Sequence, residues 1–190
     1  MSRIALIVGL GNPGAEYEAT RHNAGFWFVE ELARQAGVEW RKDTRFHSQV
    51  GKANLHGNTV WLLKPDTFMN RSGQAVSALA KYYKIPVEEI LVAHDELDFD
   101  PGVVKLKRGG GHAGHNGLRD IISAMGSKDF LRLRIGIGHP GNAKQVSDFV
   151  LTRPSNADRH CINDAIDEAQ RAVPALLEGD VEKAMRELHR

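Results

Sequence analysis

Apolar residues in this chain fall into short runs separated by polar loops, a pattern typical of an α/β protein. Two of the runs are continuously apolar, as expected of strands that are buried on both faces of a sheet. Two further strands within residues 46–64 are joined near Gly57-Asn58, a good hairpin signal, and the last two strands alternate apolar and polar residues. The predicted strands lie at residues 4–8, in two segments within 46–64, and at 90–93, 103–107 and 131–137.

Helical periodicity separates these strands. Phe26, Val29 and Leu32 recur on one face of a predicted helix over residues 23–35, and Gly37 is placed to end it. Further helices are predicted from Ser72 to before Pro86, from near Leu118, from Ser155 to Leu177, and after Asp180. We expect Asn23 and Asn116 to cap the helices that follow them, and Pro174 to kink or break its helix.

The intermixed strands and helices predict one α/β domain over residues 1–190, with a twisted mixed β-sheet and helices packed on both faces. A chain of 190 residues suits one core, and 42% hydrophobic with 26% charged residues is an ordinary globular balance. The first apolar run is too short for a signal peptide, and no stretch approaches the roughly 20 apolar residues of a membrane helix. Since a lone Cys161 excludes an intramolecular disulfide, we expect a cytoplasmic protein.

The formal net charge of +1 means that any nucleic-acid binding must depend on a local basic patch. Lys105 and Lys107 share one face of a predicted strand, and Arg132 and Arg134 share one face of another. Together they could bind phosphate. The alternation of charge suits a solvated sheet face equally well, and the pattern does not decide between the two interpretations.

Residues 9–14, Gly-Leu-Gly-Asn-Pro-Gly, match a dinucleotide-binding fingerprint after a strand. Pro13 within the turn and a helix that starts only near Asn23 weaken that interpretation. The glycines also suit a tight turn, or a backbone that presents Asn12 to a ligand. His22 follows in the same loop, where α/β proteins often place ligands, and imidazole is the usual general base near neutral pH.

His94-Asp95-Glu96 ends the second buried strand, where a carboxylate could orient a histidine by accepting its ring N–H. A metal site with His112 and His115 is the alternative, but their spacing is not typical of zinc. The segment 64–72 is either a helix entrance with Phe68 and Met69 packed on the next turn, or a substrate contact through the Asn70 amide.

These segments, in this order, resemble the bacterial peptidyl-tRNA hydrolase family over nearly the whole chain. The matching stretches are residues 9–14 with Tyr17, 21–23, 67–73, 94–97, 109–117 and 132–138. The resemblance implies an esterase that cleaves the bond between a peptide and the 3′-terminal ribose of tRNA, and so recycles tRNA from aborted translation.

The resemblance also implies roles for individual residues. His22 would activate a water, and Asp95 would hold its imidazole. Substrate would be bound by Asn12, Tyr17, Phe68, Met69, Asn70 and Asn116, and the tRNA 5′-phosphate by Lys107 and Arg134 with added charge from Lys105.

Ester hydrolysis needs a base, an oriented water and donors for the oxyanion, so we expect no cofactor and no metal. The expected partner is peptidyl-tRNA; we expect a monomer with no obligate protein partner and no membrane contact. The competing hypotheses are a non-catalytic RNA-binding module and a dinucleotide-dependent oxidoreductase. Residues 138–150 suit either a mobile lid or a static loop.

Overall fold

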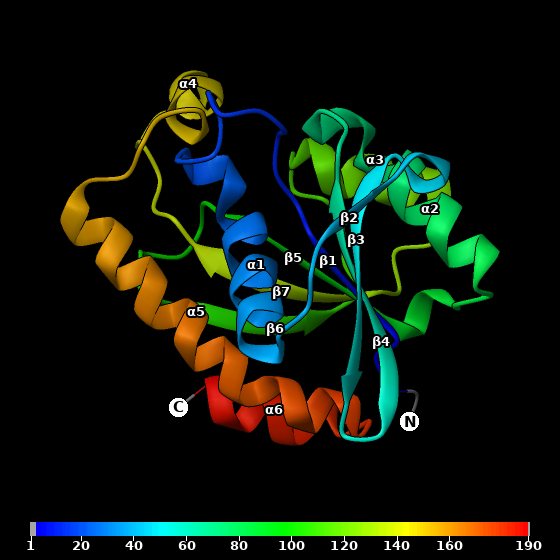
Figure 1. Ribbon diagram of the computed structural model, residues 1–190. Helices are drawn as coiled ribbons and strands as arrows, with labels where there is room; N and C mark the ends of the chain where they lie inside the picture. The colour runs from blue at the N-terminus through cyan, green and yellow to red at the C-terminus, as the bar shows by residue number, and fades with distance from the viewer. Residues whose placement is uncertain (1–2, 190) are drawn as a thin grey trace.

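A seven-stranded mixed sheet forms the centre of the computed structural model, which describes residues 3–189 (Figure 1). Its strand order is β2-β3-β4-β1-β5-β7-β6. Strand β1 is parallel to β4 and β5, and β5 is parallel to β7, whereas the pairs β2–β3, β3–β4 and β6–β7 are antiparallel. The strands are β1 (Leu6–Gly9), β2 (Arg41–Asp43), β3 (Ser48–Leu55), β4 (Asn58–Pro65), β5 (Ile90–Glu96), β6 (Val104–Arg108) and β7 (Leu131–Gly136).

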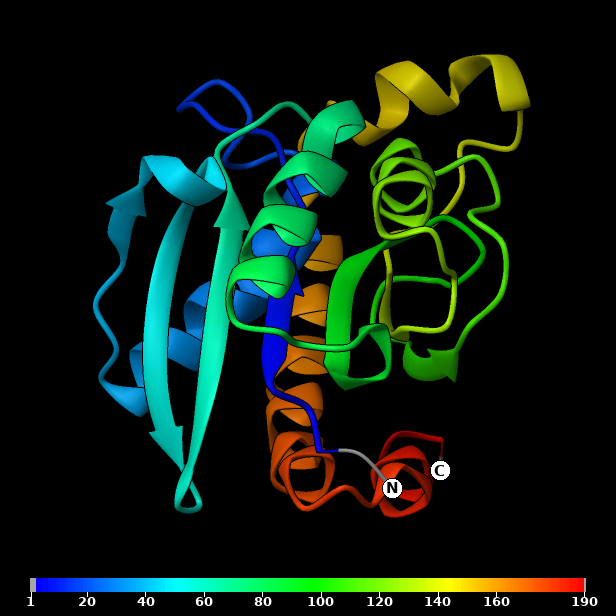
Figure 2. The ribbon, with the colours of Figure 1, turned by 90° about the vertical axis from the view of Figure 1, so that its right-hand side faces the viewer.

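Helices cover both faces of this sheet, so the predicted fold class is confirmed (Figures 1 and 2). One apolar cluster joins the sheet to α1 and α5, and a second joins its other face to α2 and α3. No helix within residues 3–189 combines the length and apolar character needed to cross a membrane. The helices are α1 (Ala24–Ala36), α2 (Ser72–Tyr82), α3 (Asn116–Met125), α4 (Val146–Val150), α5 (Asn156–Leu177) and α6 (Val181–Leu188), with 3₁₀ turns at Arg21–Asn23, Thr44–Phe46, Met69–Arg71, Val87–Glu89 and Ala143–Gln145.

Two predicted helix boundaries, at Gly37 and at Asp180, are confirmed. Gly37 adopts the left-handed conformation that ends α1, and the Asp180 side chain accepts from the Lys183 amide to start α6. Strand β2 was not predicted, because its three residues are all charged and carry no apolar alternation. It pairs with β3 at the edge of the sheet, where charged side chains reach solvent.

Neither asparagine side chain caps a helix as predicted, although Asn23 does occupy the N-cap position of α1. The Asn23 side chain makes no capping bond to α1, because its amide is bonded to the backbone of Asn12. Helix α3 already begins at Asn116, and the ring nitrogen Nδ1 of His115 caps it by accepting from the Gly117 and Leu118 amides. Asn23 is thereby used to hold the Asn12 backbone, whereas Asn116 is left exposed at the start of α3.

Pro174 does not break α5, which continues to Leu177. Proline removes the one backbone hydrogen bond that its own N–H would donate, and only the last turn of α5 follows Pro174. Val173, Leu176 and Leu177 around it are buried in the core. Burial of these side chains outweighs the missing bond.

Candidate active site

The candidate site lies at the carboxyl ends of β1 and β5. After β1 the chain leads to α1 on one face of the sheet, and after β4 it leads to α2 on the other. Loops therefore diverge from this edge, the position where open α/β sheets bind ligands. His22, in the loop after β1, and Asp95, near the end of β5, meet at this edge.

Close backbone contact between β1, β5 and α1 brings the two residues together. A Cβ atom on Gly25 would lie 2.3 Å from the Ala93 carbonyl oxygen, and one on Gly9 would lie 2.4 Å from the Gly25 oxygen. The Leu10 amide donates to the same Ala93 oxygen at 3.0 Å. Because only glycine permits this approach, the start of α1 lies directly on the strand that carries Asp95.

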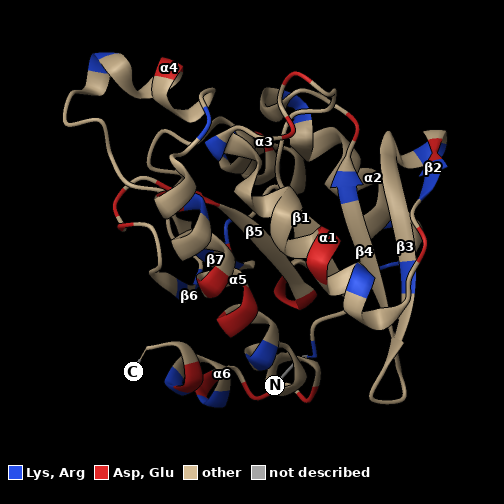
Figure 3. Ribbon diagram, turned by 60° about the vertical axis from the view of Figure 1, so that its left-hand side comes forward, with Lys and Arg blue, Asp and Glu red and all other residues tan. Residues whose placement is uncertain are grey.

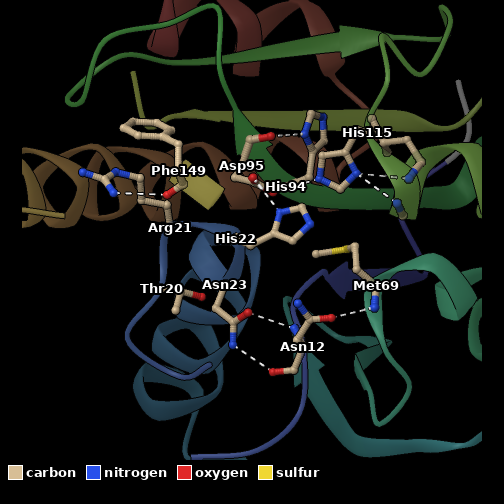
Figure 4. Close-up of polar contacts among 12 residues, drawn as sticks. Asn12, Thr20, Arg21, His22, Asn23, Met69, His94, Asp95, His115 and Phe149 are labelled. Carbon is tan, nitrogen blue, oxygen red and sulfur yellow. Dashed lines mark hydrogen bonds and ion pairs between the residues drawn. The ribbon is translucent and has the colours of Figure 1, made fainter. Parts of the chain in front are cut away.

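His22 Nδ1 lies 2.8 Å from Asp95 Oδ2, so the contact expected from the resemblance is present (Figure 4). The Asp95 side chain is only 2% exposed, and that of His22 is 12% exposed. An ionised carboxylate can only accept, so Nδ1 of His22 carries the proton and Nε2 presents its lone pair. His22 has the tautomer that a general base requires.

A second histidine occupies the other oxygen of Asp95. His115 Nε2 lies 2.8 Å from Asp95 Oδ1, and its Nδ1 accepts from the two amides at the start of α3. Because those amides can only donate, His115 carries its proton on Nε2 and donates it to Asp95. Asp95 thus joins the base to the helix that begins with Asn116.

The pair perturbs both pKa values. Burial by itself lowers the pKa of His22, but the charge of Asp95 and its hydrogen bond outweigh burial and raise that pKa above 6.5. Burial by itself raises the pKa of Asp95, but the charge and hydrogen bonds of the neighbouring imidazoles hold that pKa well below its usual range. For His94, which is fully buried beside His115, burial chiefly lowers the pKa to about 4.

Asn12 is fixed beside His22 by three hydrogen bonds. Its backbone N–H donates to Asn23 Oδ1 at 2.8 Å, and its carbonyl accepts from Asn23 Nδ2 at 3.0 Å. Its side-chain oxygen accepts from the Met69 amide at 2.7 Å (Figure 4). With the oxygen engaged, the Asn12 side chain has its NH₂ group left to offer a ligand.

A cavity of about 660 Å³ connects these groups. One wall of the cavity is formed by the segment around α4, through residues 143, 146, 147, 150 and 151. Arg21 contacts this segment, with the central carbon of its guanidinium 3.9 Å from the centroid of the Phe149 ring. Phe68 is 59% exposed, whereas Met69 is buried. Of the two, only Met69 is therefore packed as the helix-entrance interpretation expected. The predicted site residues that line the cavity are Asn12, His22, Phe68, Met69, Asn70, Asp95, Lys107, Asn116 and Arg134.

Two predicted site residues lie outside that lining. Tyr17 packs edge-to-face against Phe68, with ring centroids 6.2 Å apart, and so supports the cavity mouth. Lys105 lies opposite Arg134 in the β6–β7 register, with its ammonium 5.2 Å from the Phe99 ring centroid. Lys105 thus lies next to the cavity on the same sheet face as Lys107.

The two arginines of β7, Arg132 and Arg134, have different partners, which the alternation of charge did not predict. Arg132 is buried and donates to the carbonyls of Gly110 and Gly111, so it holds the glycine loop. Arg134 donates from Nε to Glu96 Oε1 at 2.8 Å. Over the side of the molecule in Figure 3, Lys and Arg positions are interspersed with Asp and Glu, consistent with a net charge of +1.

The metal and dinucleotide alternatives both meet structural objections. In the described part of the chain, His22, Asp95 and His115 bring their ligand atoms within 4.8 Å of one another. His115 would have to give up the Nε2 proton that its bonds to α3 require, so this set does not suit a metal. Helix α1 begins well after Gly14, so its first turn does not adjoin the fingerprint as a dinucleotide site requires.

Sequence reasoning missed the positioning groups around the site. His115 was weighed only as a metal ligand, Asn23 only as a cap, and Glu96 only as part of a charged run. The sequence did offer one signal for these three residues: each lies next to a predicted site residue, and polar groups around a site often orient the residues that act in it. Their partners lie far away along the chain and could not be inferred.

Fold and site together define an α/β protein with a carboxylate-oriented histidine facing an open cavity, the arrangement of a hydrolytic enzyme that activates water. The peptidyl-tRNA hydrolase family model matches residues 6–190, and the chain belongs to this family. It is 60% identical over 187 residues to a peptidyl-tRNA hydrolase of Saccharophagus degradans, covering 98% of this chain and 95% of that protein. The corresponding protein of Alcanivorax borkumensis is 57% identical over 187 residues, covering 98% and 96%.

A solved structure gives the same result. The crystal structure of peptidyl-tRNA hydrolase from Acinetobacter baumannii superimposes with a TM-score of 0.96 at 53% identity, covering 99% of this chain and 95% of that one. The expected family is thereby confirmed, and so is the expected fold.

Proposed function

We propose that this protein hydrolyses the ester bond between a peptide and the 3′-terminal ribose of tRNA. The observation that carries the proposal is the His22–Asp95 hydrogen bond, which leaves His22 Nε2 free as a base beside a cavity. Family membership supplies the substrate class. Cytoplasmic location, a monomeric state and independence from metal stay predictions.

In the proposed reaction, His22 Nε2 removes a proton from a water, and the water oxygen attacks the ester carbonyl carbon. Asp95 keeps the ring in the required tautomer and stabilises the imidazolium that forms. The tetrahedral intermediate then expels the ribose 3′-oxygen, which takes the proton from His22. A peptide with a free carboxylate and a tRNA with a free 3′-hydroxyl result.

We propose that Asn12 stabilises the developing oxyanion; its NH₂ group makes no hydrogen bond within the described residues, and its backbone is fixed by Asn23, which supports this role. Asn70 and Asn116 are exposed amides at the cavity and are proposed to bind the peptide backbone or the attacking water. Tyr17, Phe68 and Met69 would contact the substrate at the mouth. Amide contacts to a peptide bond would favour peptidyl over aminoacyl esters.

Lys107 and Arg134, which line the same cavity as His22, are proposed to bind the 5′-phosphate of tRNA, with Lys105 beside them. In a tRNA, the 5′ and 3′ ends of the chain meet in the acceptor stem. A phosphate site and an ester-cleaving site in one cavity therefore suit one substrate. A small basic face suffices, which agrees with a nearly neutral protein.

Release of peptide from N-acetylated aminoacyl-tRNA tests the proposal. The wild-type chain is expected to cleave the ester in the presence of a chelator, and His22→Ala is expected to lose turnover by at least about 10²-fold while still binding tRNA. A wild-type chain that binds tRNA without ester loss would instead be an RNA-binding module. Wild-type turnover in His22→Ala would overturn the assigned mechanism.

A further inference from the structure

Glu96 is an acidic residue on the face that the proposed function assigns to phosphate binding. It ends β5, two residues after His94, so the two side chains lie on one face of the strand. Its side chain is 13% exposed, and it lines the cavity together with Lys107 and Arg134. A carboxylate in a phosphate site costs affinity, so its presence calls for a function.

The contacts of Glu96 show what it holds. Its Oε1 accepts from Arg134 Nε at 2.8 Å, and its Oε2 accepts from the Asp98 backbone N–H at 3.2 Å. The Arg134 guanidinium also stacks on Phe99, with its central carbon 4.5 Å from the ring centroid. The plane of the guanidinium and its inner edge are therefore fixed before any ligand arrives.

This arrangement leaves the outer edge of Arg134 for a ligand. Among residues 3–189, neither terminal guanidinium nitrogen makes a hydrogen bond, and these two nitrogens form the fork that recognises phosphate. Lys107 and Lys105 add positive charge on the same face, while Arg132 is directed to the glycine loop. Glu96 is the one carboxylate bonded to a cation of this set within the described residues.

We infer that Glu96 is a positioning residue that orients the Arg134 fork and offsets part of its charge, so that the face selects the 5′-phosphate yet lets the tRNA product leave. The inference rests on the proposed function. Substrate and product carry the same 5′-phosphate, so a stronger phosphate site would hold the product as firmly as the substrate. By offsetting part of the Arg134 charge, Glu96 would weaken binding of the tRNA product and so favour turnover.

Two substitutions separate the charge of Glu96 from its hydrogen bond. Glu96→Gln removes the negative charge and keeps one oxygen, which is expected to stay with the shorter bond from Arg134 Nε, while the Asp98 backbone N–H loses its acceptor. It is expected to bind deacylated, 5′-phosphorylated tRNA about three- to tenfold more tightly than wild type at low salt, with product inhibition increased to match. Glu96→Ala also loses the orienting bond and is expected to lose much of the preference for a 5′-phosphate.

Asp98→Asn is the matched control, because it removes an exposed carboxylate two residues away whose side chain makes no bond to Arg134. Dissociation constants are measured by fluorescence anisotropy for one tRNA with and without its 5′-phosphate, and thermal unfolding verifies folding. Tighter binding by Glu96→Gln only, and only to the phosphorylated tRNA, supports the inference. An unchanged affinity, or an equal gain in Asp98→Asn or on dephosphorylated tRNA, overturns it.

Binding and hydrolysis are measured separately, so the two proposals can fail separately. A wild-type chain without esterase activity would refute the proposed function whatever the affinities. An active wild-type chain whose Glu96→Gln variant shows no gain would refute only the inference about Glu96.

Discussion

Replacing Asp95 with asparagine tests the hydrogen-bond arrangement of the site, because the change keeps the size of the side chain while it removes one acceptor and the negative charge. Asp95 accepts from His22 Nδ1 and from His115 Nε2, each at 2.8 Å. An amide offers only one oxygen, and its NH₂ group can only donate. One of the two histidines must therefore lose its acceptor.

The structure decides which histidine loses it. His115 is bound to its tautomer by two backbone amides of α3, whereas the Nε2 atom of His22 faces the cavity. In Asp95→Asn, the oxygen of the introduced amide would therefore turn to His115, and its NH₂ group would face His22. That donor forces the His22 proton onto Nε2, where no lone pair is left to accept a proton from water.

A hydrogen bond to an ionised group contributes about 1.5–3 kcal/mol, and returning the ring to its active tautomer adds to this. A total of about 4 kcal/mol corresponds to about a 10³-fold loss of kcat. The assay measures initial rates of peptide release from saturating N-acetylated aminoacyl-tRNA. A loss of less than about tenfold would refute the tautomer argument, since one lost charge-assisted bond already costs that much.

A double variant provides the control. In Asp95→Asn with His115→Ala, the amide oxygen has no competing donor and can turn to His22. The double variant is therefore expected to be more active than Asp95→Asn, after His115→Ala has been measured by itself to determine the cost of losing the α3 cap. If the double variant is no more active than the single one, His115 does not direct the amide.

Three further changes follow from the same geometry. The acidic limb of kcat/KM should have its midpoint above 6.5, because His22 acts only when neutral and its pKa is raised; a midpoint below 6.5 would contradict the pairing. Asn23→Ala should cost about 2 kcal/mol in urea unfolding and also lower kcat, because it frees the Asn12 loop, and unchanged kcat would count against this. Gly25→Ala should lower the free energy of unfolding by about 3 kcal/mol or more, because its Cβ would lie 2.3 Å from a backbone oxygen of β5. Gly37→Ala has open space around its Cβ but a φ of +67°, so it should cost only about 1 kcal/mol. Equal losses of stability in the two variants would refute the close-contact argument.

Much of the fold could be predicted from local pattern. Apolar runs predicted six of the seven strands, and Gly37 and Asp180 ended or started helices as expected, because each signal depends on residues adjacent in the chain. The two asparagine side-chain caps failed for different reasons: α3 begins at Asn116 itself and is capped by the His115 ring. Asn23 has a better partner in Asn12, a contact that propensity rules do not include.

By itself, the sequence determined the fold class, the family resemblance and the identity of the reactive groups, since residue types and their order are local information. It could place His22 in the loop after one buried strand and Asp95 at the end of the other. Only the tertiary structure decided that they touch, because the contact depends on backbones that approach at Gly9 and Gly25. It also decided that His115 shares the carboxylate, which links a residue of β5 with residues from two separate loops. Such contacts depend on the parallel pairing of β1 with β5, a long-range arrangement that no short stretch of sequence encodes.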